Sequence, residues 1–154
     1  MHERSRAPLV KLWRLSGSDR LLVMQATLWL AVAAVAIATL PFQRVGLLAA
    51  QRLRRPTPPD SIRHAKIKRI RWAIRVAAAR VPWRALCFQE GLAAQFMLRR
   101  RGIPSVLYYG AAQDEQNGLL THVWVRDRDV EVVGGEIASR FAVLATFPPE
   151  PGSL

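Results

Sequence analysis

Residues 85–110, ALCFQEGLAAQFMLRRRGIPSVLYYG, decide the fold that we predict for this 154-residue chain. Apolar residues in its first half recur every three or four positions, which is typical of a helix with one buried face. Three consecutive arginines followed by Gly102 and Pro104 are a signature of a helix C-terminus. Cys87, the only cysteine of the chain, therefore lies in the first turn of a predicted helix.

The position of Cys87 at a helix start has chemical consequences. Free backbone N–H groups and the positive end of the helix dipole stabilise a thiolate and lower its pKa. The same N–H groups can hydrogen-bond an oxyanion. A lone cysteine can also be a small buried apolar residue, so the choice between a nucleophile and a core residue depends on the rest of the sequence.

After Pro104 the pattern changes from the period of a helix to that of strands. The predicted elements are strands over 105–110, 119–125 and 130–133, a polar loop over 111–118 and a turn over 127–129. Alternation along the second strand places His122 and Trp124 on one face. We therefore predict an α+β fold with N-terminal helices and then a Cys-bearing helix packed on a small antiparallel sheet, the arrangement of papain-like and transglutaminase-like folds.

The N-terminal part of the chain is dominated by an uncharged segment over residues 21–40. Twenty such residues with basic residues on both sides are long enough to cross a bilayer. An apolar helix can equally be buried in a core or lie on a membrane surface, and both interpretations remain open. A proline-rich connector over 54–60 then suggests a division into an N-terminal apolar helical segment, 1–55, and a core, 56–154, which form one compact unit.

A basic helix follows this connector and ends at Pro82. Its apolar residues recur at helical spacing, and its cations occupy other faces: Arg63, Lys66, Arg69, Arg71 and Arg75. This basic surface is either simply solvated or a docking surface for an acidic peptide or phosphates. The formal net charge of +12 fits an acidic partner or an anionic membrane. The chain has no recognisable nucleic-acid module, so we predict no nucleic-acid partner.

The composition of the chain excludes several kinds of site. One cysteine excludes an intramolecular disulfide and a multi-thiolate zinc site, and it fits a reducing cytoplasm. The three histidines are scattered without metal-ligand spacing, so we predict neither a metal nor a cofactor. A thiol nucleophile then needs a general base, and the strand residue His122 is the candidate.

Taken in order, three segments resemble the lasso peptide biosynthesis B protein family, a family of stand-alone peptidases with a transglutaminase-like fold. These segments are CFQEGLAAQFMLRRRGIPSVLYYG, then THVWV, then EVVGGEIASRFAVLATF, and the resemblance is strongest over residues 82–147. Before them, an apolar helix ending in Pro41-Phe42 and a basic helix are compatible with the family.

The resemblance implies a cysteine endopeptidase that removes the leader from a ribosomally made lasso peptide precursor. It implies that Cys87 is the nucleophile and His122 the general base, with backbone N–H groups around Cys87 as oxyanion donors. The implied partners are the precursor, a small leader-binding protein and a separate ATP-using cyclase, in the cytoplasm, with a membrane surface as a further partner through residues 21–40.

The third catalytic member is where this chain departs from the family, because many relatives have an aspartate where Gly134 stands. If the hairpin turns at Arg128, Glu136 projects from the same face as His122, so we choose Glu136 first and Glu131 second. Asp129 and a backbone carbonyl stay open. Two other functions also remain: acyl transfer to an amine by the same Cys-His pair, and a noncatalytic membrane-associated interaction protein.

Overall fold

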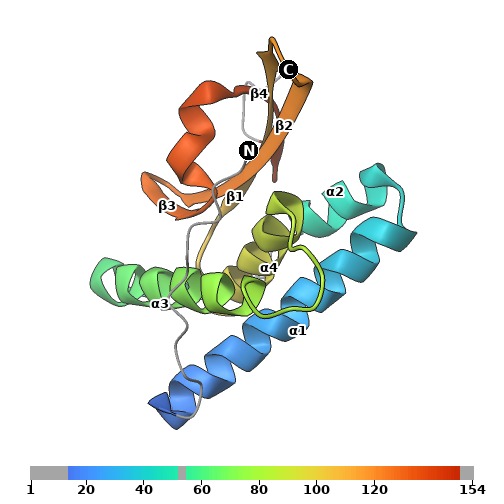
Figure 1. The fold of residues 1–154 in the computed structure, drawn as a ribbon. Coiled ribbons are helices and arrows are strands. Elements are labelled where there is room, and N and C mark those ends of the chain that lie inside the picture. The colour runs from blue at the N-terminus through green and yellow to red at the C-terminus, as the bar shows by residue number, and fades with distance from the viewer. Residues whose placement is uncertain (1–13, 52–54, 150–154) are drawn as a thin grey trace.

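A computed structural model of the chain describes residues 14–51 and 55–149 (Figure 1). The elements in chain order are α1 (Gly17–Thr39), α2 (Phe42–Ala50), α3 (Asp60–Ala78), α4 (Cys87–Arg99), β1 (Val106–Asp114), β2 (Gly118–Asp127), β3 (Val130–Val133), the 3-10 helix η2 (Gly135–Arg140) and β4 (Ala142–Phe147). The four strands form one antiparallel sheet in the order β3-β2-β1-β4. The predicted α+β class is confirmed, with helices first and a small antiparallel sheet after them.

The hairpin between β1 and β2 is longer than predicted. The polar residues expected to form a loop over 111–118 continue β1 as far as Asp114, and β2 begins at Gly118. The carboxylate of Asp114 accepts hydrogen bonds from the backbone N–H groups of Gln116 and Asn117, at 3.0 and 2.8 Å. This side chain closes the turn within three residues, so no longer loop is needed.

The chain leaves the sheet directly after β3. Arg128 adopts a φ of 53° in the tight turn between β2 and β3. The sequence predicted a turn at this place. Gly134 adopts a φ of 74°, a left-handed conformation that favours glycine, and the chain then turns into η2. The strand ends at Val133, as predicted, but the predicted placement of Glu136 on the same face as His122 is wrong, because Glu136 lies on η2.

Helix α4 lies between the sheet and the other helices (Figure 1). Its Gly91 is packed against the sheet so closely that an added β-carbon would lie 2.8 Å from a methyl carbon of Val123 and 3.2 Å from one of Leu107. These two side chains are buried and face the helix. The absence of a side chain at Gly91 thus sets the distance between α4 and the strands, and with it the position of Cys87 one turn earlier.

We expect Gly91→Ala to lower the free energy of unfolding by about 1–3 kcal/mol, because the extra methyl group has to push α4 away from buried side chains. Urea unfolding followed by circular dichroism measures the change. Gly17→Ala is the matched control, since no atom lies within 4 Å of a β-carbon at Gly17. An equal effect of both substitutions would show that close packing at Gly91 is not the cause.

Helix α1 begins at Gly17 and packs along α3 and α4. Ser16 caps its start, because the hydroxyl oxygen accepts a hydrogen bond from the backbone N–H of Asp19 at 3.2 Å. The helix is long and apolar enough to cross a membrane, yet 33% of its apolar stretch is buried inside the protein. One side of α1 therefore belongs to the protein core.

Arg63 is an exception to the predicted basic surface of α3. Its side chain is 3% exposed, and its Nε lies 3.0 Å from the carboxylate of Asp127, which is also buried. Burial raises the pKa of Asp127, and the positive charge of Arg63 acts in the opposite direction. This ion pair connects α3 to the end of β2, so Arg63 is a structural residue and not part of a docking surface.

Candidate active site

Cys87 is the first residue of α4, as the sequence predicted. The preceding residue, Leu86, donates its backbone N–H to the side-chain oxygen of Gln89 at 3.3 Å. The same oxygen accepts a hydrogen bond from the indole N–H of Trp83 at 3.2 Å. Gln89 thereby fixes the path by which the chain enters the helix, and this holds the half-buried thiol of Cys87 in place.

The surroundings of the thiol differ from what the helix start alone suggests. Hydrogen bonds from the backbone at Val123, at Phe88 and at Cys87 itself lower the pKa of the thiol. Desolvation by burial is the larger effect and raises that pKa above its usual value, and the negative charge of Glu90 adds to the rise. The lowering influence predicted for the helix start is present, but burial outweighs it. A base has to take the proton when Cys87 reacts.

The backbone holds one ring nitrogen of His122. Its Nε2 lies 2.7 Å from the carbonyl oxygen of Gly134. Because a carbonyl can only accept, Nε2 carries the hydrogen and Nδ1 keeps its lone pair for a proton. The ring packs against those of Trp124 and Phe141, with centroids 6.0 and 5.0 Å away. These contacts fix both the tautomer and the orientation of the imidazole.

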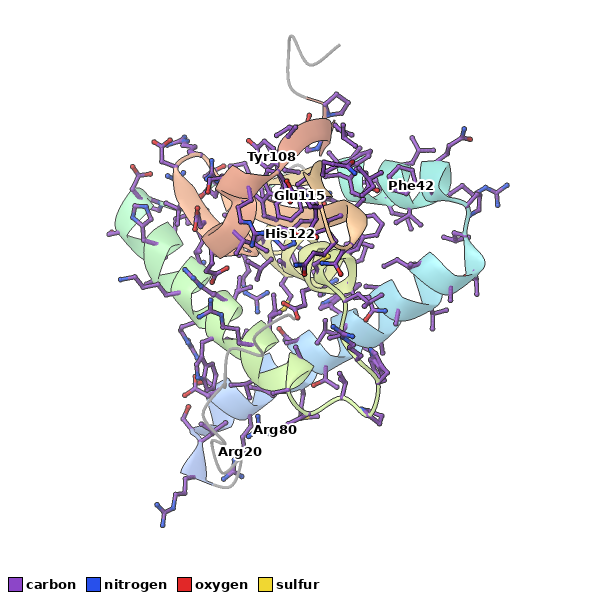
Figure 2. The ribbon with its side chains drawn as sticks, turned by 45° about the horizontal axis from the view of Figure 1, so that its top comes forward. Arg20, Phe42, Arg80, Tyr108, Glu115 and His122 are labelled. Carbon is purple, nitrogen blue, oxygen red and sulfur yellow. The ribbon has the colours of Figure 1, made fainter. Side chains whose placement is uncertain are left out.

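The thiol of Cys87 and the imidazole of His122 lie near the same part of β2, where β3 has ended. Beyond Val133 the neighbouring strand β3 has ended, and Gly134 lies so close to β2 that a β-carbon there would be 2.5 Å from the carbonyl oxygen of Val123. The backbone of Val123 also contacts the thiol of Cys87. Cys87 therefore lies against Val123, the residue that follows His122 in the chain. Figure 2 shows His122 near the middle of the molecule.

The three carboxylates considered as partners of His122 lie elsewhere. Glu136 is on η2, where its carboxylate forms ion pairs with Arg71, at 2.8 Å, and with Arg75. Glu131 pairs with Arg126 on the neighbouring strand at 3.1 Å, and Asp129 is exposed in the turn after β2. The group that the structure places on the imidazole is the carbonyl of Gly134, in line with the backbone alternative left open by the sequence.

Glu90 is a site residue to which the sequence analysis gave no role. It stands one turn after Cys87, and desolvation by burial raises its pKa to about 7. Arg75 acts against this rise and Glu136 adds to it. The spacing of three residues from Cys87 was the signal available in the sequence, since such residues share one side of a helix. The charge of Glu90 therefore acts on the thiol, and the charge of Arg75 acts on Glu90.

We expect Glu90→Gln to stabilise the protein above neutral pH. A carboxyl group whose pKa rises on folding favours the folded state below its unfolded value, near 4.5, and this contribution is lost as pH rises through about 7. Glutamine removes the ionisation, so the variant should gain up to about 3 kcal/mol at about pH 8 and little at about pH 5.

Urea unfolding of both proteins at the two pH values measures this difference. The matched control is Glu115→Gln, at the exposed turn between β1 and β2. A Glu90→Gln variant that is less stable than the natural protein at the higher pH would contradict the raised pKa.

Within residues 14–51 and 55–149, no group of three or more histidine, cysteine, aspartate or glutamate side chains is placed to hold a metal ion. The site described here consists of a thiol, an imidazole and backbone donors. These groups can carry out nucleophilic acyl transfer.

Comparison with known proteins agrees with this chemistry. Searches of curated proteins and of solved structures gave no match. Residues 27–146 match the model of the transglutaminase-like superfamily, and this range includes Cys87, His122 and Gly134. The chain belongs to the transglutaminase-like superfamily, whose members are in general cysteine-dependent enzymes.

Proposed function

We propose that this protein is a cysteine endopeptidase that removes the leader peptide from a ribosomally made lasso peptide precursor. The observation that carries the proposal is the position of the Cys87 thiol on the backbone of Val123, next to a histidine whose Nε2 lies on the carbonyl of Gly134. Family membership supports a cysteine protease or acyltransferase. The resemblance of residues 82–147 to the lasso B proteins supports the choice of precursor.

In the proposed reaction, the sulfur of Cys87 attacks the carbonyl carbon at the leader–core junction while Nδ1 of His122 takes the thiol proton. The carbonyl oxygen becomes an oxyanion, which the backbone N–H groups near Cys87 stabilise. The imidazolium then protonates the amine of the core peptide, the C–N bond breaks, and the leader remains as a thioester on Cys87.

Water completes the reaction. His122 takes a proton from the attacking water and returns it to the sulfur, which releases the leader with a free carboxylate. Throughout, the carbonyl of Gly134 holds the Nε2 hydrogen and steadies the imidazolium. It fills the position of the missing aspartate, but it carries a partial charge only, so it stabilises the imidazolium less than a carboxylate would.

The core peptide released in this way has a free N-terminal amine, which a separate ATP-using cyclase consumes. A small leader-binding protein presents the precursor, in the cytoplasm. The arginines considered for this docking are engaged within the chain: Arg71 and Arg75 on Glu136, and Arg69 on Asp19. A partner would therefore have to bind the exposed parts of these ion pairs.

Mass spectrometry of a lasso peptide precursor incubated with this protein and the leader-binding partner tests the proposal. The expected result is one cut at the leader–core junction, with the mass of one water shared between the two products. A leader that carries the mass of an added amine would assign the protein to acyl transfer instead. An intact precursor, with the partner present and the protein folded, would contradict both reactions.

A further inference from the structure

The outward side of α1 carries a continuous apolar stripe. Its members are spaced by three or four residues, so they lie along one face of the helix. They are Leu21 (56% exposed), Met24 (67%), Leu28 (59%), Val32 (39%) and Val35 (62%). We call this set the α1 stripe. Figure 1 shows α1 along an outer edge of the molecule, so the other described elements leave this face uncovered. Such a row of exposed aliphatic side chains marks a contact with another apolar phase.

The opposite side of α1 is already occupied. Its buried residues pack with those of α3 and α4 in one core, and they include Leu22, Ala26, Leu30 and Ala33. A helix that crossed a bilayer would have to give up these contacts. The helix is about 35 Å long at 1.5 Å per residue, and it can keep them while lying flat, with only the α1 stripe inserted.

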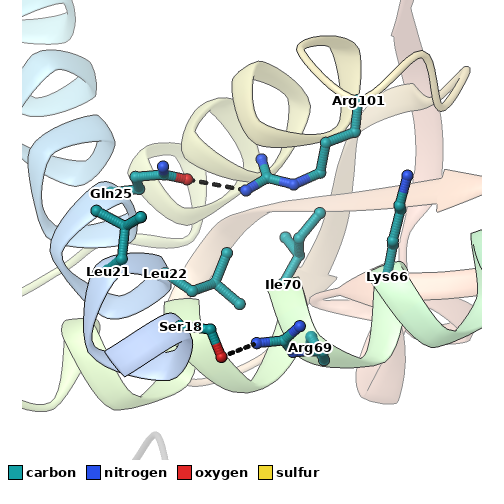
Figure 3. A pocket seen from close by; sticks show the side chains of 8 residues that line it. All are labelled: Ser18, Leu21, Leu22, Gln25, Lys66, Arg69, Ile70 and Arg101. Carbon is teal, nitrogen blue, oxygen red and sulfur yellow. Dashed lines mark hydrogen bonds between the residues drawn. The ribbon is translucent and has the colours of Figure 1, made fainter. Parts of the chain in front are cut away.

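A cationic pocket borders the α1 stripe at its N-terminal end (Figure 3). Its volume is about 210 Å³, and Leu21 belongs to both features. Lys66 and Arg69 of α3 and Arg101, which follows α4, line the pocket on its other side. Arg101 donates to the side-chain oxygen of Gln25 at 2.8 Å.

The charges of this pocket are not balanced. Arg69 is paired with the carboxylate of Asp19 at 2.7 Å, which leaves two cations in excess over this one carboxylate. Burial lowers the pKa of Arg101, and the nearby charges of Arg100 and Arg69 lower it further. An anion in the pocket would relieve this repulsion, and the guanidinium groups and the Ser18 hydroxyl are donors suited to phosphate oxygens.

We propose that α1 and the adjoining pocket form a docking site for a membrane surface that contains anionic phospholipid. The α1 stripe enters the boundary between headgroups and acyl chains, and the pocket takes a headgroup phosphate. Each feature supports the same partner: an apolar stripe without nearby cations would suit a second protein, and cations without a stripe would suit a soluble anion. The proposal does not depend on the peptidase function.

Flotation of the full chain with lipid vesicles tests this site without any cleavage assay. One set of vesicles contains phosphatidylcholine with phosphatidylglycerol, and the other contains phosphatidylcholine alone. We expect binding to the anionic vesicles. Met24→Gln combined with Leu28→Gln should weaken it by about tenfold or more, because two exposed apolar side chains no longer enter the lipid. Lys66→Glu should weaken it by about tenfold.

Matched variants distinguish this site from attraction by net charge. Leu119→Gln removes an equally exposed leucine at the start of β2, and Arg140→Glu makes the same change of charge on η2. Both should bind the anionic vesicles as the natural protein does. Circular dichroism confirms that each variant is folded.

Three results would overturn the proposal: no flotation with either set of vesicles, equal flotation with both sets, or equal weakening in the variants and their controls. Sedimentation of the free protein adds a fourth. A dimer that the Met24 and Leu28 substitutions dissociate, without any vesicle binding, would identify a second copy of the chain as the partner of the α1 stripe.

Discussion

Cys87→Ala is expected to abolish processing of the precursor, with turnover reduced by about 10⁴-fold or more, because no other side chain can form the thioester. Cys87 is the only cysteine, so no neighbouring thiol can replace it. The rate is measured by mass spectrometry of the released leader under single-turnover conditions with the leader-binding partner present.

Cys87→Ser is the companion variant for this prediction. Serine keeps the size and the hydrogen-bonding capacity of the residue at the start of α4, so the fold should be unchanged. Its hydroxyl is a far weaker nucleophile in a site arranged for a thiol, and turnover should fall nearly as far. Processing that persisted in both variants would return Cys87 to the role of a core residue and favour a noncatalytic protein.

His122→Ala is expected to lower turnover by about 10³-fold, because the imidazole is the base that we propose takes the proton from a half-buried thiol of raised pKa. The loss should shrink as pH rises and more of the thiol ionises without help. The pH dependence of turnover in this variant and in the natural protein therefore measures the part played by the imidazole.

Glu136→Gln separates the two arrangements considered for the third catalytic member. If the carbonyl of Gly134 orients His122, as its 2.7 Å contact indicates, this variant should keep its turnover within a few-fold and lose only the ion pairs with Arg71 and Arg75. A loss as large as that of His122→Ala would show that Glu136 orients the imidazole during the reaction.

The helix that begins with Cys87 could be predicted from sequence because its signals are local. The apolar repeat, the three arginines and Gly102 all act within a few residues, and the structure follows them. The face of β2 that carries His122 with Trp124 was also predictable, because side chains alternate along any strand.

The features that the sequence did not reveal depend on contacts between distant segments. Glu136 forms ion pairs with Arg71 and Arg75, which are more than sixty residues earlier in the chain. The raised pKa of Cys87 comes from burial between α4 and β2, a distance-dependent effect that opposes the local effect of the helix start. The length of β1 depended on a single side chain, Asp114, closing the turn.

The group that orients the His122 imidazole also depends on a contact that the sequence does not reveal. Gly134 carries no side chain, so only the left-handed turn after β3 places its carbonyl on His122. Many proteins of the lasso B family have an aspartate where Gly134 stands, and a glycine offers no side chain to compare with it. The transglutaminase-like fold could be inferred from the order of the segments, and the match over residues 27–146 shows the superfamily.

The most direct test of the Cys87–His122 pair uses a leader peptide that ends in a chloromethyl ketone where the scissile amide would begin. The full chain is incubated with this peptide and the leader-binding partner, and the intact protein is then weighed by mass spectrometry. We predict one adduct, a thioether on Cys87 formed with release of chloride, that forms much more slowly in His122→Ala and with a leader of scrambled sequence. Equal labelling of all three samples, or no adduct on the natural protein, would contradict the account.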